Sequence, residues 1–244
     1  IGAAFGLGFI LGPALGGLLG EINSRAPFFL SAFLTCLNFL FGFFVLPESL
    51  SVQKRRKFSL SSLNPFQTIW EAFAFKKLRI GLICFFIIST AHWVYPAIWS
   101  FWGKEVFGWG SGMIGFSLAC YGIGISVVQG FIIRLEFVSK VGARWVVTFS
   151  LAVGASAMIA LGFTSIAWVV FFIIPFSALS ELLTPTLGSF FSNQISDLEQ
   201  GKLQGVLASL SAFTTIISPL IMTTIFSHTS TVADDFYLPG APYL

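Results

Sequence analysis

Charged residues are scarce in this 244-residue sequence. Asp, Glu, Lys and Arg together make up 9% of the residues, whereas soluble globular domains carry about 25%. Apolar residues reach 56%, and apolar stretches of about 20 residues, the length that a helix needs to cross the hydrocarbon of a bilayer, recur along the chain. The composition therefore excludes a soluble globular domain and predicts an all-α membrane protein that crosses the bilayer several times.

Cysteine and histidine are also scarce. The three cysteines, Cys36, Cys84 and Cys120, all lie in apolar stretches, where a thiol behaves as a small apolar group. Their spacing excludes a disulfide framework and a zinc site. The two histidines belong to no metal-ligand or nucleophile pattern. We therefore expect no metal, no cofactor and no enzymatic activity.

The apolar stretches predict seven membrane spans, at residues 1–20, 27–46, 79–101, 112–134, 145–163, 167–188 and 204–227. The longest connection, 47–78, separates two spans in 1–46 from five in 79–244. Within it, Asn64, Pro65 and Gln67 form a typical helix start. We expect a short helix there, which lies along the membrane interface or packs on the bundle as an ordinary loop helix.

The basic residues are distributed unequally between the two ends of these spans. All 13 Lys and Arg residues except Arg25 and Lys104 fall at the connections after the second, fourth and sixth spans. The positive-inside rule places these connections in the cytoplasm. Because this topology also explains the basic run at 54–57, we expect the lipid bilayer as a partner and no nucleic acid.

The first span holds helix-weakening residues among apolar ones. Gly8, Gly12 and Gly16 recur at four-residue spacing, which predicts a smooth stripe that another helix can approach closely. Pro13 removes a backbone hydrogen bond and is expected to bend the helix. The alternative is a simple glycine contact in which the proline has no role of its own.

Together with Gly17, these residues make the pattern G-x-x-x-G-P-x-x-G-G, which resembles the fifth-helix signature of drug:proton antiporters of the major facilitator superfamily. Further stretches are similar to its tetracycline-resistance branch and follow in the same order. They are APFF from Ala26, LPES from Leu46, NPF from Asn64, PAIW from Pro96, GFSLACYGIG from Gly115 and EQGKLQGVLASL from Glu199. The resemblance implies a partial helical bundle of this superfamily, covering helices five to eleven of twelve.

The resemblance also implies a function. Residues 1–46 would be the last two helices of an N-terminal six-helix bundle, and 79–244 a C-terminal bundle that lacks its last helix. The bundles would rock about a central site and export small, amphipathic compounds or drugs in exchange for protons across the cytoplasmic membrane of a bacterium. The glycine-rich helix would seal the contact between the halves. An uncoupled facilitator, an importer of a small metabolite and a transporter-derived sensor are the alternatives.

Ionisable residues inside membrane spans are candidates for function by default, and here they are Glu181 and His92. A desolvated carboxyl group favours its neutral form, so Glu181 could take up and release a proton. His92 titrates near neutrality and could relay one. We hypothesise that both take part in proton coupling. The alternatives are a structural carboxyl group bonded to a neighbouring helix and a satisfied core histidine.

Other polar and aromatic residues share faces with these two. Ser177 and Thr184 lie on the helical face of Glu181, and Trp99 lies on that of His92. Gln129 resembles a polar position of the tetracycline branch, although an interhelical hydrogen bond would also explain it. We expect these four residues to line a substrate cavity. Tryptophans at the outer end of the third span, namely Trp99, Trp102 and Trp109, are expected to act as interfacial anchors.

The sequence also departs from the tetracycline branch. That branch carries an acidic residue where this chain has Gly154 and a histidine where it has Ile125, so we do not expect tetracycline as the substrate. The superfamily's cytoplasmic loop motif G-x-L-A-D-R-x-G-R is matched only by Lys140, Gly142 and Arg144. A charge-pair lock at this loop therefore does not follow from the sequence.

Overall fold

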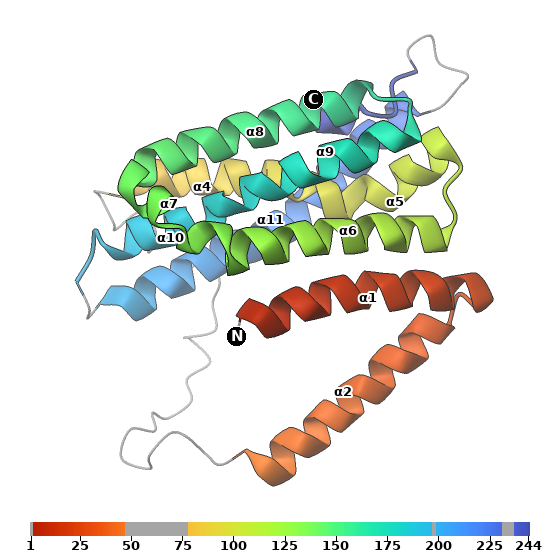
Figure 1. Cartoon of the computed structure of the whole chain (residues 1–244), viewed down its shortest axis with the longest axis horizontal. Helices are drawn as coiled ribbons and strands as arrows, with labels where there is room; N and C mark the ends of the chain where they lie inside the picture. Colours follow the sequence, from red (N-terminus) through yellow and green to blue (C-terminus); the bar gives the residue numbers. More distant parts are fainter. Residues whose placement is uncertain (1, 47–77, 197–198, 231–236) are drawn as a thin grey trace.

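The computed structural model describes residues 2–46, 78–196, 199–230 and 237–244, and within these residues every regular element is a helix (Figure 1). The α-helices are α1 (Gly2–Ile22), α2 (Ala26–Val45), α4 (Arg79–His92), α5 (Val94–Phe107), α6 (Ser111–Gly130), α7 (Glu136–Val141), α8 (Ala143–Phe163), α9 (Ala167–Leu179), α10 (Leu183–Ser192) and α11 (Gln200–Thr229). Short 3₁₀ turns lie at η3 (Ile132–Arg134), η4 (Ser180–Leu182) and η6 (Ala241–Tyr243). The helix expected near Asn64 lies outside the described residues.

Among the described residues, six helical segments are long and apolar enough to cross a membrane, and they confirm the predicted all-α membrane fold. They are Ala26–Val45, Arg79–Phe107, Ser111–Arg134, Ala143–Phe163, Ala167–Ser192 and Gln200–Thr229. The first predicted span is the shorter apolar helix Gly6–Ile22 within α1. The third span extends to Phe107 and not only to 101, because α5 continues until Gly108 ends it in a left-handed conformation, with a φ of 66°.

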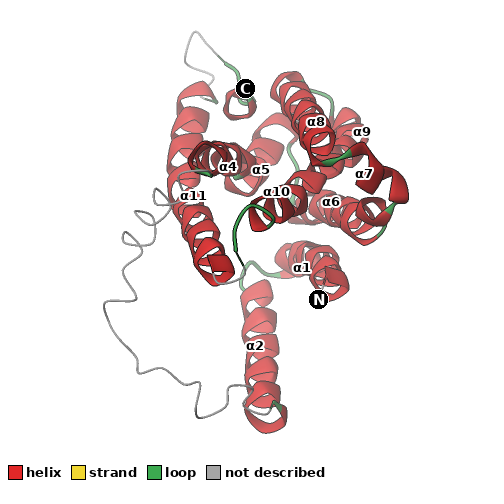
Figure 2. Ribbon diagram, turned by 90° about the vertical axis from the view of Figure 1, so that its left-hand side faces the viewer, coloured by secondary structure: helices red, strands yellow, loops and turns green. Residues whose placement is uncertain are grey.

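The helices from α4 to α11 form one bundle, and α1 packs along α6 at its edge (Figure 1). The next helix, α2, leaves the end of α1 at an angle and splays away from the bundle (Figures 1 and 2). None of its residues is buried in the described structure. The assignment of α1 and α2 to a separate N-terminal bundle stays a prediction.

The contact between α1 and α6 uses the face of α1 next to the predicted glycine stripe. Outside their own helix, Gly8, Gly12 and Gly16 have no described atom within 4 Å of where a Cβ would lie. The neighbouring face packs instead. A Cβ on Gly17 would lie 2.9 Å from the Cα of Gly115. The contacting face is therefore displaced by one residue, about 100° around the helix.

The surface of α6 explains this rotation of α1. The Cα of Gly115 lies against the carbonyl of Pro13, and a Cβ on Gly122 would lie 2.7 Å from the carbonyl oxygen of Phe9. Backbone meets backbone at both points, which only glycine permits. Pro13 and Gly17 thus belong to the contact with α6. Helix α1 continues through Pro13 without ending.

The three tryptophans expected as interfacial anchors are instead buried. Trp99, Trp102 and Trp109 are 5%, 0% and 7% exposed and belong to one hydrophobic core. The left-handed turn at Gly108 folds the chain back, and the Trp109 ring packs on Gly103, where a Cβ would lie 2.9 Å from Cε3. The expectation was wrong because their position along the span did not reveal this reversal.

Candidate substrate and proton site

Two membrane-spanning segments are broken at the residues that carry charge. Helix α4 ends at His92, and Pro96, four residues later, has no N–H to donate to the His92 carbonyl. Glu181 lies in the 3₁₀ turn η4, and Pro185 likewise follows it by four residues. Each ionisable residue therefore lies at a discontinuity where backbone polarity is exposed, a construction typical of ion and substrate sites in transporters.

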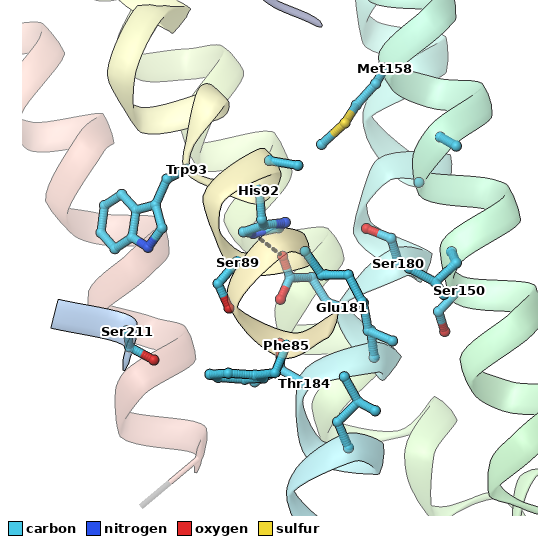
Figure 3. Close-up of a pocket in the computed structure, with 17 residues that line it drawn as sticks. Phe85, Ser89, His92, Trp93, Ser150, Met158, Ser180, Glu181, Thr184 and Ser211 are labelled. Carbon is cyan, nitrogen blue, oxygen red and sulfur yellow. Dashed lines mark ion pairs between the residues drawn. The ribbon is translucent and has the colours of Figure 1, made fainter. Parts of the chain in front are cut away.

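These two breaks lie side by side and bring His92 and Glu181 together. The Nε2 atom of His92 lies 3.1 Å from Oε1 of Glu181, as the dashed line in Figure 3 shows. The carboxyl end of α4 favours a cation and the amino end of α10, which begins at Leu183, favours an anion. Both helix ends thus stabilise the charges of a protonated histidine and an ionised glutamate. The sequence placed each residue separately and gave no sign that they pair.

A tyrosine that the sequence did not indicate, Tyr121, also contacts Glu181. The Tyr121 hydroxyl donates a hydrogen bond of 2.7 Å to Oε1 of Glu181. The ring of Tyr121 stacks on that of Tyr95 at 6.0 Å between centroids, and Tyr95 also lies edge-on to His92 at 5.7 Å. Tyr95 could have been found from its spacing to His92 on the same span. Tyr121 could not, since it comes from α6.

A first cavity of about 380 Å³ opens on one side of the pair (Figure 3). Hydroxyl groups from four segments line it, with the expected residue Thr184 among them, as do Gly154 and both members of the pair. The hydroxyl-bearing residues are Ser89, Ser150, Ser180, Thr184 and Ser211. Gly154 is the position at which the tetracycline branch carries an acid, so this wall lacks that charge.

A second cavity, of about 290 Å³, also adjoins the pair and is mainly aromatic. His92 and Glu181 line it too, and the aromatic residues around it are Phe9, Trp93, Tyr95, Trp99 and Tyr121. The structure thus places the expected residues Trp99, Gln129 and Ser177 around the same space as the pair. Ile125, which stands where the tetracycline branch has a histidine, is also in this wall.

The loop-motif residues lie apart from both cavities. Lys140 pairs with Glu136 on its own helix α7, at 2.8 Å between exposed side chains. Gly142 has a φ of 86°, which joins α7 to α8, and Arg144 is exposed in the first turn of α8. Their role as a conformational motif stays a prediction. Among the described residues, no group of three or more His, Cys, Asp and Glu residues could hold a metal ion.

Comparisons with known proteins agree with this architecture. No family model matches the chain. It is 35% identical over 225 residues to the class C tetracycline resistance protein of Escherichia coli, and the aligned region covers 92% of this chain and 56% of that protein. The class B protein of Escherichia coli is 32% identical over 234 residues, covering 96% and 58%. Multidrug resistance protein 2 of Bacillus subtilis is 25% identical over 233 residues, covering 91% and 55%.

The chain therefore spans a little more than half the length of these curated relatives. The six apolar helices in the described part of the chain and its bacterial relatives make it a multi-pass protein of the bacterial inner membrane. Over the length that it shares with them, the chain is similar to the tetracycline resistance proteins, and its all-helical fold is consistent with a partial helical bundle of the major facilitator superfamily.

Proposed function

We propose that the protein exports small, amphipathic compounds in exchange for protons by alternating access, with His92 and Glu181 as the proton-carrying pair. The observation that carries this proposal is the 3.1 Å contact of these two residues at two adjoining helix breaks. Both residues line two cavities, so a change of charge at the pair alters the electrostatic potential in both cavities.

The pair can exist in states that differ by one proton. With His92 protonated and Glu181 ionised, the two side chains attract and hold α4 against η4. Loss of the histidine proton removes that attraction. In the described part of the chain, the other titratable groups that face the pair are Tyr95 on α5 and Tyr121 on α6. Coupling requires only that protons and substrate favour different orientations of the protein, because each ligand shifts the equilibrium by its difference in affinity.

Export of drugs is supported by the printed names of the relatives, which are tetracycline, multidrug and quinolone resistance proteins. The volume of the aromatic cavity, about 290 Å³, is near the lower end of ligand pockets, which begin at about 300 Å³. It therefore suits a small compound. Gly154 and Ile125 leave the cavity walls without two polar groups of the tetracycline branch, and we propose a substrate other than tetracycline.

The test is transport by the full-length protein in proteoliposomes with an imposed pH gradient. Efflux of proflavine and tetracycline is followed by fluorescence, and proton movement by an enclosed pH-sensitive dye. We expect the gradient to drive proflavine efflux, and both Glu181→Gln and His92→Gln to remove the gradient-driven part. Glu105→Gln removes an exposed carboxylate at the end of α5 and is the matched control.

Two outcomes contradict the proposal. If Glu181→Gln exports as fast as the parent under the same gradient, the pair does not carry the proton. If flux through the parent protein ignores the gradient altogether, the protein is an uncoupled facilitator.

A further inference from the structure

The polar groups of the aromatic cavity are largely engaged with the protein itself. Trp99 donates its ring N–H to the hydroxyl of Ser117 at 2.9 Å, and Tyr95 donates to Ser177 at 3.4 Å. Tyr121 donates to Glu181. Because these donors are used, the rings offer a ligand their faces and edges. The negative face of an aromatic ring attracts cations and repels anions.

The carboxylate of Glu181 is only half engaged. Tyr121 and His92 both reach Oε1, at 2.7 and 3.1 Å, and neither contact involves Oε2. An ionised carboxylate accepts hydrogen bonds at both oxygens. Glu181 is 8% exposed and lines the cavity, so a third donor that satisfies Oε2 would come from a ligand in that space.

The balance of charge in the cavity points the same way. His92 and Glu181 are its ionisable lining residues apart from Tyr95 and Tyr121, and no Lys or Arg of the described chain lines it. When His92 is neutral, the cavity carries one uncompensated negative charge. The remaining wall is apolar and includes Leu118, Ile125 and Ile174. A buried negative charge among apolar and aromatic groups is costly to leave unpaired.

We propose that this cavity binds a flat aromatic cation, whose charged nitrogen donates to Oε2 of Glu181 and whose rings lie against Tyr95, Trp99 and Tyr121. The ligand's charge takes the place of the His92 proton, which passes to water as the cation binds and returns as it leaves. This inference names the substrate class of the site in the proposed function and rests on it. It also explains how the His92 proton and a bound cation would exclude each other, although His92 contacts Oε1 of Glu181 and the cation would contact Oε2.

The test is equilibrium binding to the full-length protein in nanodiscs at neutral pH with no gradient. Fused-ring probes of similar size and different charge are compared: proflavine is a cation, acridone is neutral and 9-anthracenecarboxylate is an anion. We expect proflavine to bind at least about tenfold more tightly than acridone, because only proflavine brings a positive charge to the carboxylate; a factor of ten corresponds to about 1.4 kcal/mol. The anion should bind more weakly than both.

Variants locate the charge preference. Glu181→Gln should lower proflavine affinity about tenfold and lower acridone affinity much less, and the acridone binding that remains reports that the variant is folded. Glu105→Gln should change neither affinity. Binding of proflavine to the parent protein should release protons into a weakly buffered solution, and His92→Gln should abolish that release while proflavine still binds.

The inference is overturned if the parent protein binds all the probes equally or prefers the anion, a comparison that needs no variant. It is also overturned if Glu181→Gln binds proflavine as well as the parent does. Failure of the proposed function gives a different result. Proflavine would bind the parent protein more tightly than Glu181→Gln, but its efflux would not respond to the pH gradient. Conversely, gradient-driven efflux without a preference for cations in binding leaves the proposed function standing and removes this inference.

Discussion

The hydroxyl of Tyr121 donates to the carboxylate of Glu181 at 2.7 Å across a separation of 60 residues, which ties α6 to the break between α9 and α10. This bond and the His92 contact end on the same oxygen, so Tyr121 holds that oxygen in place whichever way the histidine is protonated. It makes Tyr121 a positioning residue for the pair.

We expect Tyr121→Phe to reduce gradient-driven efflux about tenfold, because a hydrogen bond to a charged group contributes about 1.5–3 kcal/mol. The ring and its stacking on Tyr95 remain. Acridone binding should therefore be preserved, which separates loss of the hydrogen bond from collapse of the cavity. Tyr237→Phe is the control, because the exposed Tyr237 donates to Glu105 at 3.3 Å away from both cavities. Efflux at the parental rate by Tyr121→Phe would contradict the role of this bond.

The close contact of α1 and α6 predicts opposite results for two neighbouring glycines. In Gly17→Ala the new methyl would lie 2.7 Å from the carbonyl oxygen of Ser111, whereas in Gly12→Ala it would meet no described atom within 4 Å. Overpacking costs about 1–3 kcal/mol. Only Gly17→Ala should separate the helices.

A disulfide between Gly20→Cys and Ser111→Cys measures this separation. A Cβ on Gly20 would lie 3.3 Å from that of Ser111, near the range of about 3.5–4.5 Å that disulfides span. We expect the cross-link to form readily in the parent background and with Gly12→Ala, and poorly with Gly17→Ala. Equal yields with both alanines would show that α1 is rotated differently.

Glu21 at the end of α1 caps a helix that is not its own. Its Oε1 accepts a hydrogen bond of 3.1 Å from the backbone N–H of Gly112, in the first turn of α6, where the helix has no side-chain cap from Gly110. Loss of a cap costs about 0.5–2 kcal/mol. Glu21→Ala should therefore speed hydrogen exchange at the Gly112 amide several-fold. Glu105→Ala should not, and unchanged exchange in Glu21→Ala would rule out the cap.

Tyr243 carries a buried hydroxyl group that has no hydrogen-bond partner among the described residues. Its ring packs on Trp102 and Tyr95, with centroids 5.2 and 5.9 Å apart. Tyr243→Phe should therefore raise the free energy of unfolding by about 1 kcal/mol, since it removes an unpaired polar group and keeps the ring. Thermal unfolding checks the sign. Tyr243→Ala should destabilise by about 3–5 kcal/mol, and a destabilised Tyr243→Phe would show that the hydroxyl has a partner.

The sequence by itself determined the class of the protein and most of the course of its chain. Apolar runs of sufficient length can only be satisfied as helices in a bilayer, because each helix pairs its own backbone groups. The order of short motifs indicated the transporter superfamily. The position of Pro96 four residues after His92, and of Pro185 four residues after Glu181, is also a signal for both helix breaks. That signal is local, because proline acts on the carbonyl four residues earlier.

Only the tertiary structure decided how these helices face one another. The sequence of α1 has two adjoining faces that carry glycine. In the structure, the face that includes Gly17 packs on the glycines of α6. The sequence showed His92 and Glu181 as separate charges, and the tertiary structure brought their side chains within 3.1 Å of each other. Trp102 was expected at the membrane surface and is fully buried. A pattern along one helix reports the geometry of that helix alone, whereas its rotation depends on the shape of the helix it meets.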